Sequence, residues 1–351
     1  MTSGRLTYLA RASFEAARSI ASVPPEHRLA RLHGHHFCVG VKTPAAPHEE
    51  TANPPVLLSE RIAPLDFSLL NEHLGKNPLD ESIARWVRQQ MNHLPILAVE
   101  ARSTPDSGVV IDLSDNIQAW RRYRFEAAHR LPNVPSGHQC GRMHGHGFEV
   151  VLRAEAQEPA ALTQDALDDL WLPLRNALDH ACLNDIPGLE NPTSEQLAAW
   201  VMHRLQGSTP TVNRVSVYET ATAGCHYDGT HYRIWKDFRF ESATRLVQAP
   251  PGDPRRRLHG HSYLLRLRLT APLDTVLGWT IDYGDVKALF KDVYAALDHH
   301  RLDELPGIED GDLSSIVRWI AARMTSRLPA LDRLSLFEGW ERGVQLDLGS
   351  A

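Results

Sequence analysis

A sequence pattern that occurs three times along the chain limits what it can fold into. Phe14, Phe125 and Phe240 each begin a Phe-Glu-Ala-Ala or Phe-Glu-Ser-Ala tetrapeptide, and a His-Gly-His tripeptide begins 19 residues after each of them. Later in each copy, apolar residues recur at the spacing of one helix face, and a short apolar strand pattern follows. Because a fixed repeat decides the architecture, we interpret the chain as a triplicated unit of about 115 residues.

Each unit is predicted to fold as two strands, two helices and two further strands, which gives an α+β fold class with three tandem ββααββ units. The predicted units cover residues 1–118, 119–231 and 232–351. For the middle unit, the pattern predicts strands over 122–131 and 144–156, helices over 163–179 and 193–205, and two strands ending near Asp228. In the first unit, 43–64 is rich in proline, so we expect its first helix to be short or missing.

Composition excludes several partners. The chain has 351 residues, 42% of them hydrophobic, and a net charge of −6, so it can bury a full core but has no basic surface for nucleic acid or an anionic membrane. Its four cysteines have no repeated spacing, and no apolar run approaches the roughly 20 residues of a membrane span. We therefore expect a cytoplasmic protein. The basic N-terminus aligns with the first strand of the other units, so we interpret it as structural.

The polar residues differ between the three copies, although the scaffold pattern is shared. Only the middle copy has a full set at the positions compared. In the first and third copies, His129 is replaced by Arg18 and Thr244, and Cys140 by Leu29 and Arg255. The positions of Asp179-His180 are held by Asp66-Phe67 in the first copy and by Asp298-His299 in the third. The tripeptide therefore remains in all three copies, while the residues that would give it a chemical use occur together once.

Three histidines of the middle unit have the arrangement of metal ligands. His144 and His146 lie two residues apart on a predicted strand, so both side chains point to one face. His129 lies on the preceding strand of a predicted hairpin and can add a third nitrogen. Three neutral histidines with one open position form a catalytic zinc site. A lone His-x-His is more often a surface or hydrogen-bonded feature, but the third histidine favours the metal.

Other polar residues of this unit have two interpretations each. Cys140 is either a fourth ligand that closes a structural zinc site or a thiolate base beside an open one. Asp179-His180 is either a proton relay or a helix C-cap with a histidine near the negative end of the helix dipole. Glu219 is either structural, since we align it with Glu100 and Glu338, or an acceptor of two parallel N–H groups.

Several motifs together resemble a known family. Phe125 to His129, Cys140-x-x-x-His144-Gly-His146, Leu178-Asp179-His180, Asn191 to Glu195 and Tyr218-Glu219 look like 6-carboxytetrahydropterin synthase, in the 6-pyruvoyltetrahydropterin synthase superfamily with its tunnelling fold. The resemblance implies that three units close a twelve-stranded antiparallel barrel with helices outside, and that two such rings stack. It covers the middle unit, and the first and third as degenerate copies, the third retaining the Asp-His pair.

The resemblance also implies roles for the residues of the site. Zinc would bind to His129, His144 and His146, Cys140 would be the base, Asp179 and His180 its proton partners, and Glu219 the pterin anchor. The family has one unit per chain, whereas three are fused in this chain, so we expect a homodimer of pseudo-trimeric chains. Sites of this fold lie between units, which makes Asp298 and His299 an alternative catalytic pair.

The implied activity is a zinc-dependent lyase that converts 7,8-dihydroneopterin triphosphate to 6-carboxy-5,6,7,8-tetrahydropterin, in queuosine and 7-deazapurine biosynthesis. One alternative is the 6-pyruvoyl product, and another is a non-catalytic assembly that binds pterin or zinc. Arg142 is either a contact to the substrate phosphates or a solvated charge at the end of a strand. The expected partner is a pterin triphosphate, without nucleic acid or membrane.

Overall fold

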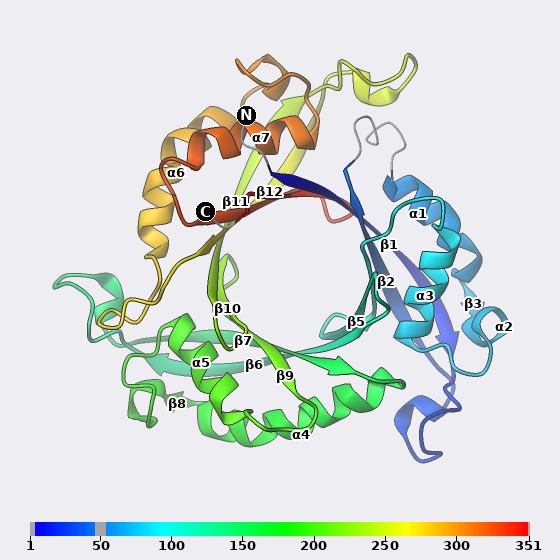
Figure 1. Ribbon diagram of the computed structural model, residues 1–351, viewed down its shortest axis with the longest axis horizontal. Helices are drawn as coiled ribbons and strands as arrows, with labels where there is room; N and C mark the ends of the chain where they lie inside the picture. Colours follow the sequence, from blue (N-terminus) through cyan, green and yellow to red (C-terminus); the bar gives the residue numbers. More distant parts are fainter. Residues whose placement is uncertain (1–3, 46–53, 350–351) are drawn as a thin grey trace.

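The computed structural model describes residues 4–45 and 54–349 and shows a single closed sheet with helices around it (Figure 1). Two of its fourteen strands, β3 (Ser68–Leu69) and β8 (Ala181–Cys182), are two-residue additions at the edge of the wall. The other twelve form an antiparallel barrel, which closes where β14 pairs with β1. The predicted α+β barrel of three ββααββ units is confirmed.

Each repeat contributes four barrel strands and the helices that cover them. The first repeat contains β1 (Arg5–Arg18), β2 (His33–Pro44), α1 (Pro54–Ile62), α2 (Leu70–Leu74), α3 (Asp80–Gln90), β4 (Ala98–Thr104) and β5 (Ser107–Asp112). The second contains β6 (Ile117–His129), β7 (His144–Ala156), α4 (Ala160–Leu178), α5 (Ser194–Arg204), β9 (Val212–Thr220) and β10 (Ala223–Tyr227). The third contains β11 (Tyr232–Thr244), β12 (His259–Thr270), α6 (Tyr283–Leu297), α7 (Leu313–Met324), β13 (Leu331–Glu338) and β14 (Arg342–Asp347).

Successive side chains along each strand point alternately to the helices, where they form a core, and to the interior of the barrel. On β7, Phe148, Val150, Leu152 and Ala154 are buried beneath the helices of their unit, and the residues between them face the interior. Burying each large apolar side chain of this kind stabilises the fold by roughly 1.5–3 kcal/mol. Each unit has its own such core, so the helices hold the wall from outside.

The observed elements differ from the predicted ones at a few ends. In the first unit, α1 is nine residues long, which agrees with the expected short helix, and 46–53 of the proline-rich stretch lie outside the described residues. The strand predicted from 122 begins at Ile117, because it continues to pair with β5 through Ile111 and Ile117. The helix predicted from 163 begins at Ala160, directly after Pro159.

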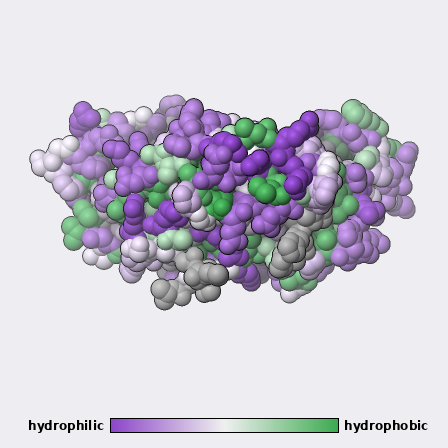
Figure 2. All heavy atoms as spheres, turned by 90° about the horizontal axis from the view of Figure 1, so that it is seen from above, coloured by the Kyte–Doolittle hydropathy of each residue, from purple (hydrophilic) through white to green (hydrophobic). Residues whose placement is uncertain are grey.

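No helix among the described residues is long and apolar enough to cross a membrane. Seen edge-on, the molecule is flat and the face in view is mostly hydrophilic, with small, separate hydrophobic areas (Figure 2).

Neighbouring units are joined at one equivalent position, the second residue of α3, α5 and α7. Glu81 accepts a hydrogen bond from the backbone N–H of Ala160 at 2.9 Å, in the next unit. Glu195 accepts two from Thr280, from its N–H at 2.8 Å and from its hydroxyl at 3.0 Å. At the junction that closes the ring, Ser314 shares a hydrogen bond with Tyr8 at 2.8 Å. Hydrogen bonds from this position therefore align each unit with the next one.

The carboxyl group at the junction of the first two units should make stability depend on pH. Glu81 is 1% exposed, and burial, followed by the nearby Asp80 and Glu158, raises its pKa to about 7. The folded state therefore keeps a proton that the unfolded chain loses near pH 4.3, so stability falls as pH rises from about 4 to 7. We expect Glu81→Gln to raise the melting temperature relative to the wild type at pH 8, by the equivalent of up to about 3 kcal/mol, and to change it much less at pH 5.

Differential scanning fluorimetry at both pH values measures this difference. The matched control is Glu60→Gln, because Glu60 is exposed on α1. The same shift at pH 5 and pH 8 in Glu81→Gln would contradict the burial argument.

Candidate active site

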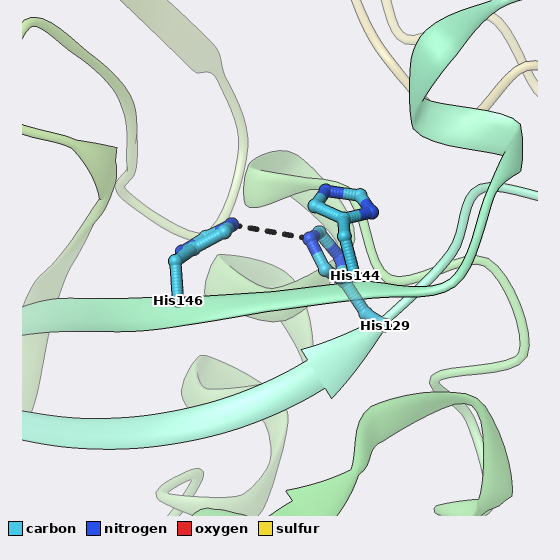
Figure 3. Close-up of side chains that lie close together, drawn as sticks. All are labelled: His129, His144 and His146. Carbon is cyan, nitrogen blue, oxygen red and sulfur yellow. Dashed lines mark hydrogen bonds between the residues drawn. The ribbon is translucent and has the colours of Figure 1, made fainter.

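Three histidines meet where β6 ends and β7 begins (Figure 3). The register pairs His129 with His144 and Ala127 with His146, so the hairpin brings all three rings to one face. One ring nitrogen from each residue lies within 4.8 Å of the other two, and the Nε2 atoms of His129 and His146 are 3.2 Å apart. The structure therefore brings together the three residues that the sequence suggested as metal ligands.

Backbone carbonyl groups orient the three rings. The Nδ1 atoms of His129, His144 and His146 lie 3.2, 2.8 and 3.1 Å from the carbonyl oxygens of Pro192, Arg142 and Gly147. A carbonyl oxygen only accepts hydrogen bonds, so each Nδ1 carries the proton and each Nε2 keeps a lone pair. Ring nitrogens that are gathered within 4.8 Å of one another in this way repel through their lone pairs unless a proton or a cation lies between them. This donor set fits a metal ion.

The ring of His129 is also kept neutral. It is fully buried at the end of β6, and this burial, together with the neighbouring His144 and His146, lowers its pKa to about 4. A metal ligand must be unprotonated, so at neutral pH this ring is ready to bind a metal.

Cys140 lies beside the triad in sequence but outside the tight group of ligand atoms among the described residues. It is half-buried in a single 3₁₀ turn, Gln139–Gly141, where its N–H donates to Nδ1 of His138 at 3.2 Å. Burial, followed by the carboxyl groups of Glu219 and Asp282, raises the pKa of the thiol. The charges of the protein near this thiol are negative, so forming a thiolate there requires a cation.

Glu219 lies at the end of β9, on the face that points towards the helices. Burial, followed by repulsion from Glu195 and Asp282, raises its pKa to about 7. Asp282 caps α6 of the third unit, and its carboxylate lies 3.2 Å from Nε2 of His138. Residues of the second and third units therefore meet around this carboxyl group, at the junction between the two units.

The sequence alignment of Glu219 with Glu100 is wrong. Val99 and Ala101 are buried on the helix side of β4, so Glu100 points into the barrel interior. Strand register places Glu219 opposite Phe148 and Glu338 opposite Tyr263, and the equivalent residue of the first unit is Ser103. The sequence analysis missed the shift because the short apolar pattern around Glu100 resembles that of the other two strands.

Three further residues lie near the site, to which the sequence alone assigned no role. Glu195, Thr280 and Asp282 lie at this junction, and the last two come from the third unit. Glu195 lies two residues after the helix cap Thr193, whose hydroxyl accepts a hydrogen bond from the N–H of Gln196 at 3.1 Å. Comparing equivalent positions within one unit does not reveal contacts across a cleft.

The equivalent positions in the first unit hold a fixed charge in place of a third histidine. Arg18 is 3% exposed, and its guanidinium donates to Asp80 at 2.8 Å and to the carbonyl of Pro78 at 2.9 Å. The Nε2 atoms of His33 and His35 are buried without a hydrogen-bond partner among the described residues. A permanent cation therefore stands beside these two rings.

In the third unit, the side chains at two of the three positions have other partners. Thr244 has no side-chain nitrogen that could bind a metal, and its hydroxyl donates a hydrogen bond to the carbonyl of Gly311 at 2.9 Å. Nε2 of His261 lies 3.0 Å from Glu338. Among the described residues, the triad of the second unit is the one group with the geometry of a metal site.

The aspartates of the three Asp-His positions have a structural role. Asp66, Asp179 and Asp298 accept hydrogen bonds from the backbone N–H groups of Glu15, Glu126 and Glu241, at 2.8, 3.0 and 3.0 Å. The residue after each aspartate returns a backbone hydrogen bond of 2.6 Å to the same glutamate. These bonds attach the segment that contains the aspartate to the first strand of each unit. They form whether or not a histidine follows the aspartate.

The residues after these aspartates point into solvent. Phe67, His180 and His299 have positive φ angles of 51°, 59° and 59°. Phe67 is 87% exposed, and the side chains of the two histidines are 80% and 77% exposed. Among the described residues, no hydrogen bond or ion pair joins either histidine to the triad or to Cys140. His299 lines a surface pocket with His261 of its own unit.

The side chain of Arg142 is exposed, while its carbonyl group orients His144. Arg31 and Arg257, at the equivalent positions, offer their carbonyls to His33 and His259 in the same way, at 2.6 and 2.7 Å. The backbone contact is therefore common to all three units.

Comparison with known proteins identifies the family. The sequence model described as 6-pyruvoyl tetrahydropterin synthase matches two consecutive stretches, residues 118–230 and 233–347, which together make up more than half of the chain. The chain belongs to the 6-pyruvoyl tetrahydropterin synthase family. The predicted superfamily is thus confirmed, with repeated units in one chain.

Two curated relatives are similar to part of the chain. 6-Carboxy-5,6,7,8-tetrahydropterin synthase of Synechocystis is 37% identical over 118 residues, which are 31% of this chain and 90% of the relative. Dihydroneopterin monophosphate aldolase of Pyrococcus furiosus is 32% identical over 93 residues, 26% of this chain and 78% of the relative. With the family match, the first relative confirms the predicted lyase-type enzyme of pterin chemistry.

Among solved structures, 6-pyruvoyl tetrahydropterin synthase of Caenorhabditis elegans is 16% identical, with a TM-score of 0.30. The match covers 32% of this chain and 92% of the nematode protein. A likeness this weak supports no further conclusion.

Proposed function

We propose that this member of the 6-pyruvoyl tetrahydropterin synthase family is a zinc-dependent lyase that converts 7,8-dihydroneopterin triphosphate to 6-carboxy-5,6,7,8-tetrahydropterin, in 7-deazapurine and queuosine biosynthesis. The observation that carries the proposal is that one ring nitrogen from each of His129, His144 and His146 lies within 4.8 Å of the other two, while a backbone carbonyl contacts each Nδ1. Three histidines leave a coordination position open for substrate, as catalytic zinc requires. The Synechocystis relative supports the choice of product.

Each residue around the triad has a proposed task. Bound zinc would polarise the oxygens of the substrate side chain and make the adjacent C–H bonds more acidic. Cys140 would remove the proton as a thiolate, because it lies outside the ligand group and is free to exchange protons. Glu219, half-buried and close enough to Glu195 for their charges to interact, would accept the N–H groups of the pterin ring.

The proton partner of the thiolate would come from an exposed Asp-His pair. We propose Asp179 and His180, because every other motif residue is intact in the second unit, with Asp298 and His299 as the alternative. Both histidines point into solvent at equivalent positions of the ring. A second chain stacked on this rim would bring such a pair to the site, so the proposed assembly is a homodimer of pseudo-trimeric rings.

Two other functions have a specific observation in their favour. The description of the matching family model favours the 6-pyruvoyl product. The buried Arg18 and the hydroxyl of Thr244, which replace the third histidine in two units, favour an assembly that binds pterin or zinc without catalysis. Product identification separates these functions from the proposed one.

The test is to incubate purified zinc-loaded protein with 7,8-dihydroneopterin triphosphate and identify the product by mass spectrometry. We expect the 6-carboxy product. In His144→Ala we expect loss of both zinc and turnover, because the open site loses one of three ligands. In Cys140→Ala we expect retained zinc and folding, with turnover lowered about 10²- to 10⁴-fold, the usual contribution of a positioned acid or base.

The matched control is Cys182→Ala, since Cys182 is also half-buried but lies on β8, outside the proposed machinery. Loss of zinc in Cys140→Ala would mean a closed structural site, and a 6-pyruvoyl product would replace the proposed reaction. Zinc binding without any product would favour the non-catalytic assembly.

A comparison of His180→Ala with His299→Ala tests which pair returns the proton. We expect turnover to fall about 10²-fold or more in His180→Ala and to stay near normal in His299→Ala, because a relay contributes to the rate and a solvated histidine does not. His203→Ala, on the exposed side of α5, is the control. The reverse result would assign the relay to the third unit.

A further inference from the structure

The interior of the barrel carries a ring of cations outside the site already described. The ninth residue after the first histidine of each His-Gly-His is Lys42, Arg153 or Arg268. All three face the interior, because their neighbours along each strand are buried on the helix side. Strand register pairs Arg153 with Arg214 and Arg268 with Arg333, which adds two guanidinium groups at the same level.

Carboxylates pair with the cations of this group in the third unit only. In the third unit, Arg268 pairs with Asp332 at 2.9 Å and Arg333 pairs with Asp347. Lys42, Arg153 and Arg214 have no ion pair within the described part of the chain. The Nε atom of Arg153 is moreover buried without a hydrogen-bond partner there. A buried donor without an acceptor costs free energy, so a missing acceptor is expected at this place.

The three unpaired cations line one cavity of about 330 Å³ inside the barrel. This volume is at the lower end of the range for small-molecule sites. The charged residues of its lining are Arg11, Lys42, Glu100, Arg102, Arg122, Arg153 and Arg214. Arg122 pairs with Glu149 at 3.0 Å, so the other five cations face the single carboxylate of Glu100 and the cavity has an excess of positive charge.

The titration behaviour of these groups agrees with their crowding. Lys42 and Arg214 are accessible to water, yet the surrounding barrel wall encloses them. Enclosure, followed by repulsion from Arg333, lowers the pKa of Lys42 to about 8. Enclosure and the neighbouring Arg153 lower the pKa of Arg214 to about 10. An anion in the cavity would relieve this repulsion.

We propose that the barrel interior binds a small inorganic oxyanion with several negative charges, of the phosphate, pyrophosphate or triphosphate class, through Lys42, Arg153 and Arg214. Guanidinium groups bind phosphate oxygens with two parallel hydrogen bonds, and a lysine adds a point charge. The site is separate from the metal centre, because nine residues of extended strand between His144 and Arg153 span about 30 Å. It therefore does not depend on the proposed enzymatic activity.

The test uses the full-length zinc-loaded protein and isothermal titration with sodium phosphate, pyrophosphate and triphosphate at constant ionic strength, set with sodium chloride. We expect saturable binding of one anion per chain, with affinity increasing from phosphate to triphosphate. The double variant Arg153→Met and Arg214→Met should bind triphosphate roughly a hundredfold more weakly, because each of the two lost charge-assisted contacts lowers the affinity by about tenfold. Lys42→Met is a second variant, in case the double variant does not fold.

Two controls separate this site from other binding. Arg175→Gln removes an exposed arginine on α4 and should leave the affinity unchanged. His144→Ala should also bind triphosphate normally, since the metal centre takes no part. Absence of saturable binding in the wild type, or unchanged affinity in both interior variants, would overturn the proposal. Loss of binding in His144→Ala would assign the anion to the metal centre instead.

Discussion

The register between β6 and β7 is the constraint on which the candidate site depends. It sets His129 opposite His144 and leaves His146 on the same face, so three rings meet without any long loop. A slip of one residue would turn His144 and His146 to the opposite face of the sheet, because side chains alternate along a strand. Closure of the barrel holds this register, since every long strand has two neighbours and none can shift alone.

One backbone geometry supports three different local chemistries. The carbonyl that orients the first histidine and the aspartate that caps the first strand occur in all three units, so they belong to the scaffold. The residue opposite that histidine then decides the outcome. His129 completes a triad with the geometry of a metal site, Arg18 places a buried guanidinium beside Asp80, and Thr244 donates a hydrogen bond to a backbone carbonyl. Removing a ligand while keeping the scaffold preserves the ring that the remaining site needs.

The sequence predicted the features that repeat or alternate, and missed those that depend on neighbours across a cleft. The offset from Phe125 to His144 recurs in each unit, and the i, i+2 spacing of the histidines fixes their common face, so the barrel and the triad were predictable. Glu100 was misaligned because a short apolar strand gives no register by itself. The contact of Glu195 with Thr280 joins different units, and no pattern within one unit indicates it.

The central claim is that one unit of three holds the metal, and anomalous X-ray diffraction at the zinc edge tests it most directly. Crystals of protein purified with zinc should give one strong anomalous peak per chain, between the Nε2 atoms of His129, His144 and His146. No peak should lie beside His33 and His35 or beside His259 and His261, where Arg18 and Thr244 stand in place of the third ligand. Peaks of equal height in all three units, or none at the triad, would contradict the account.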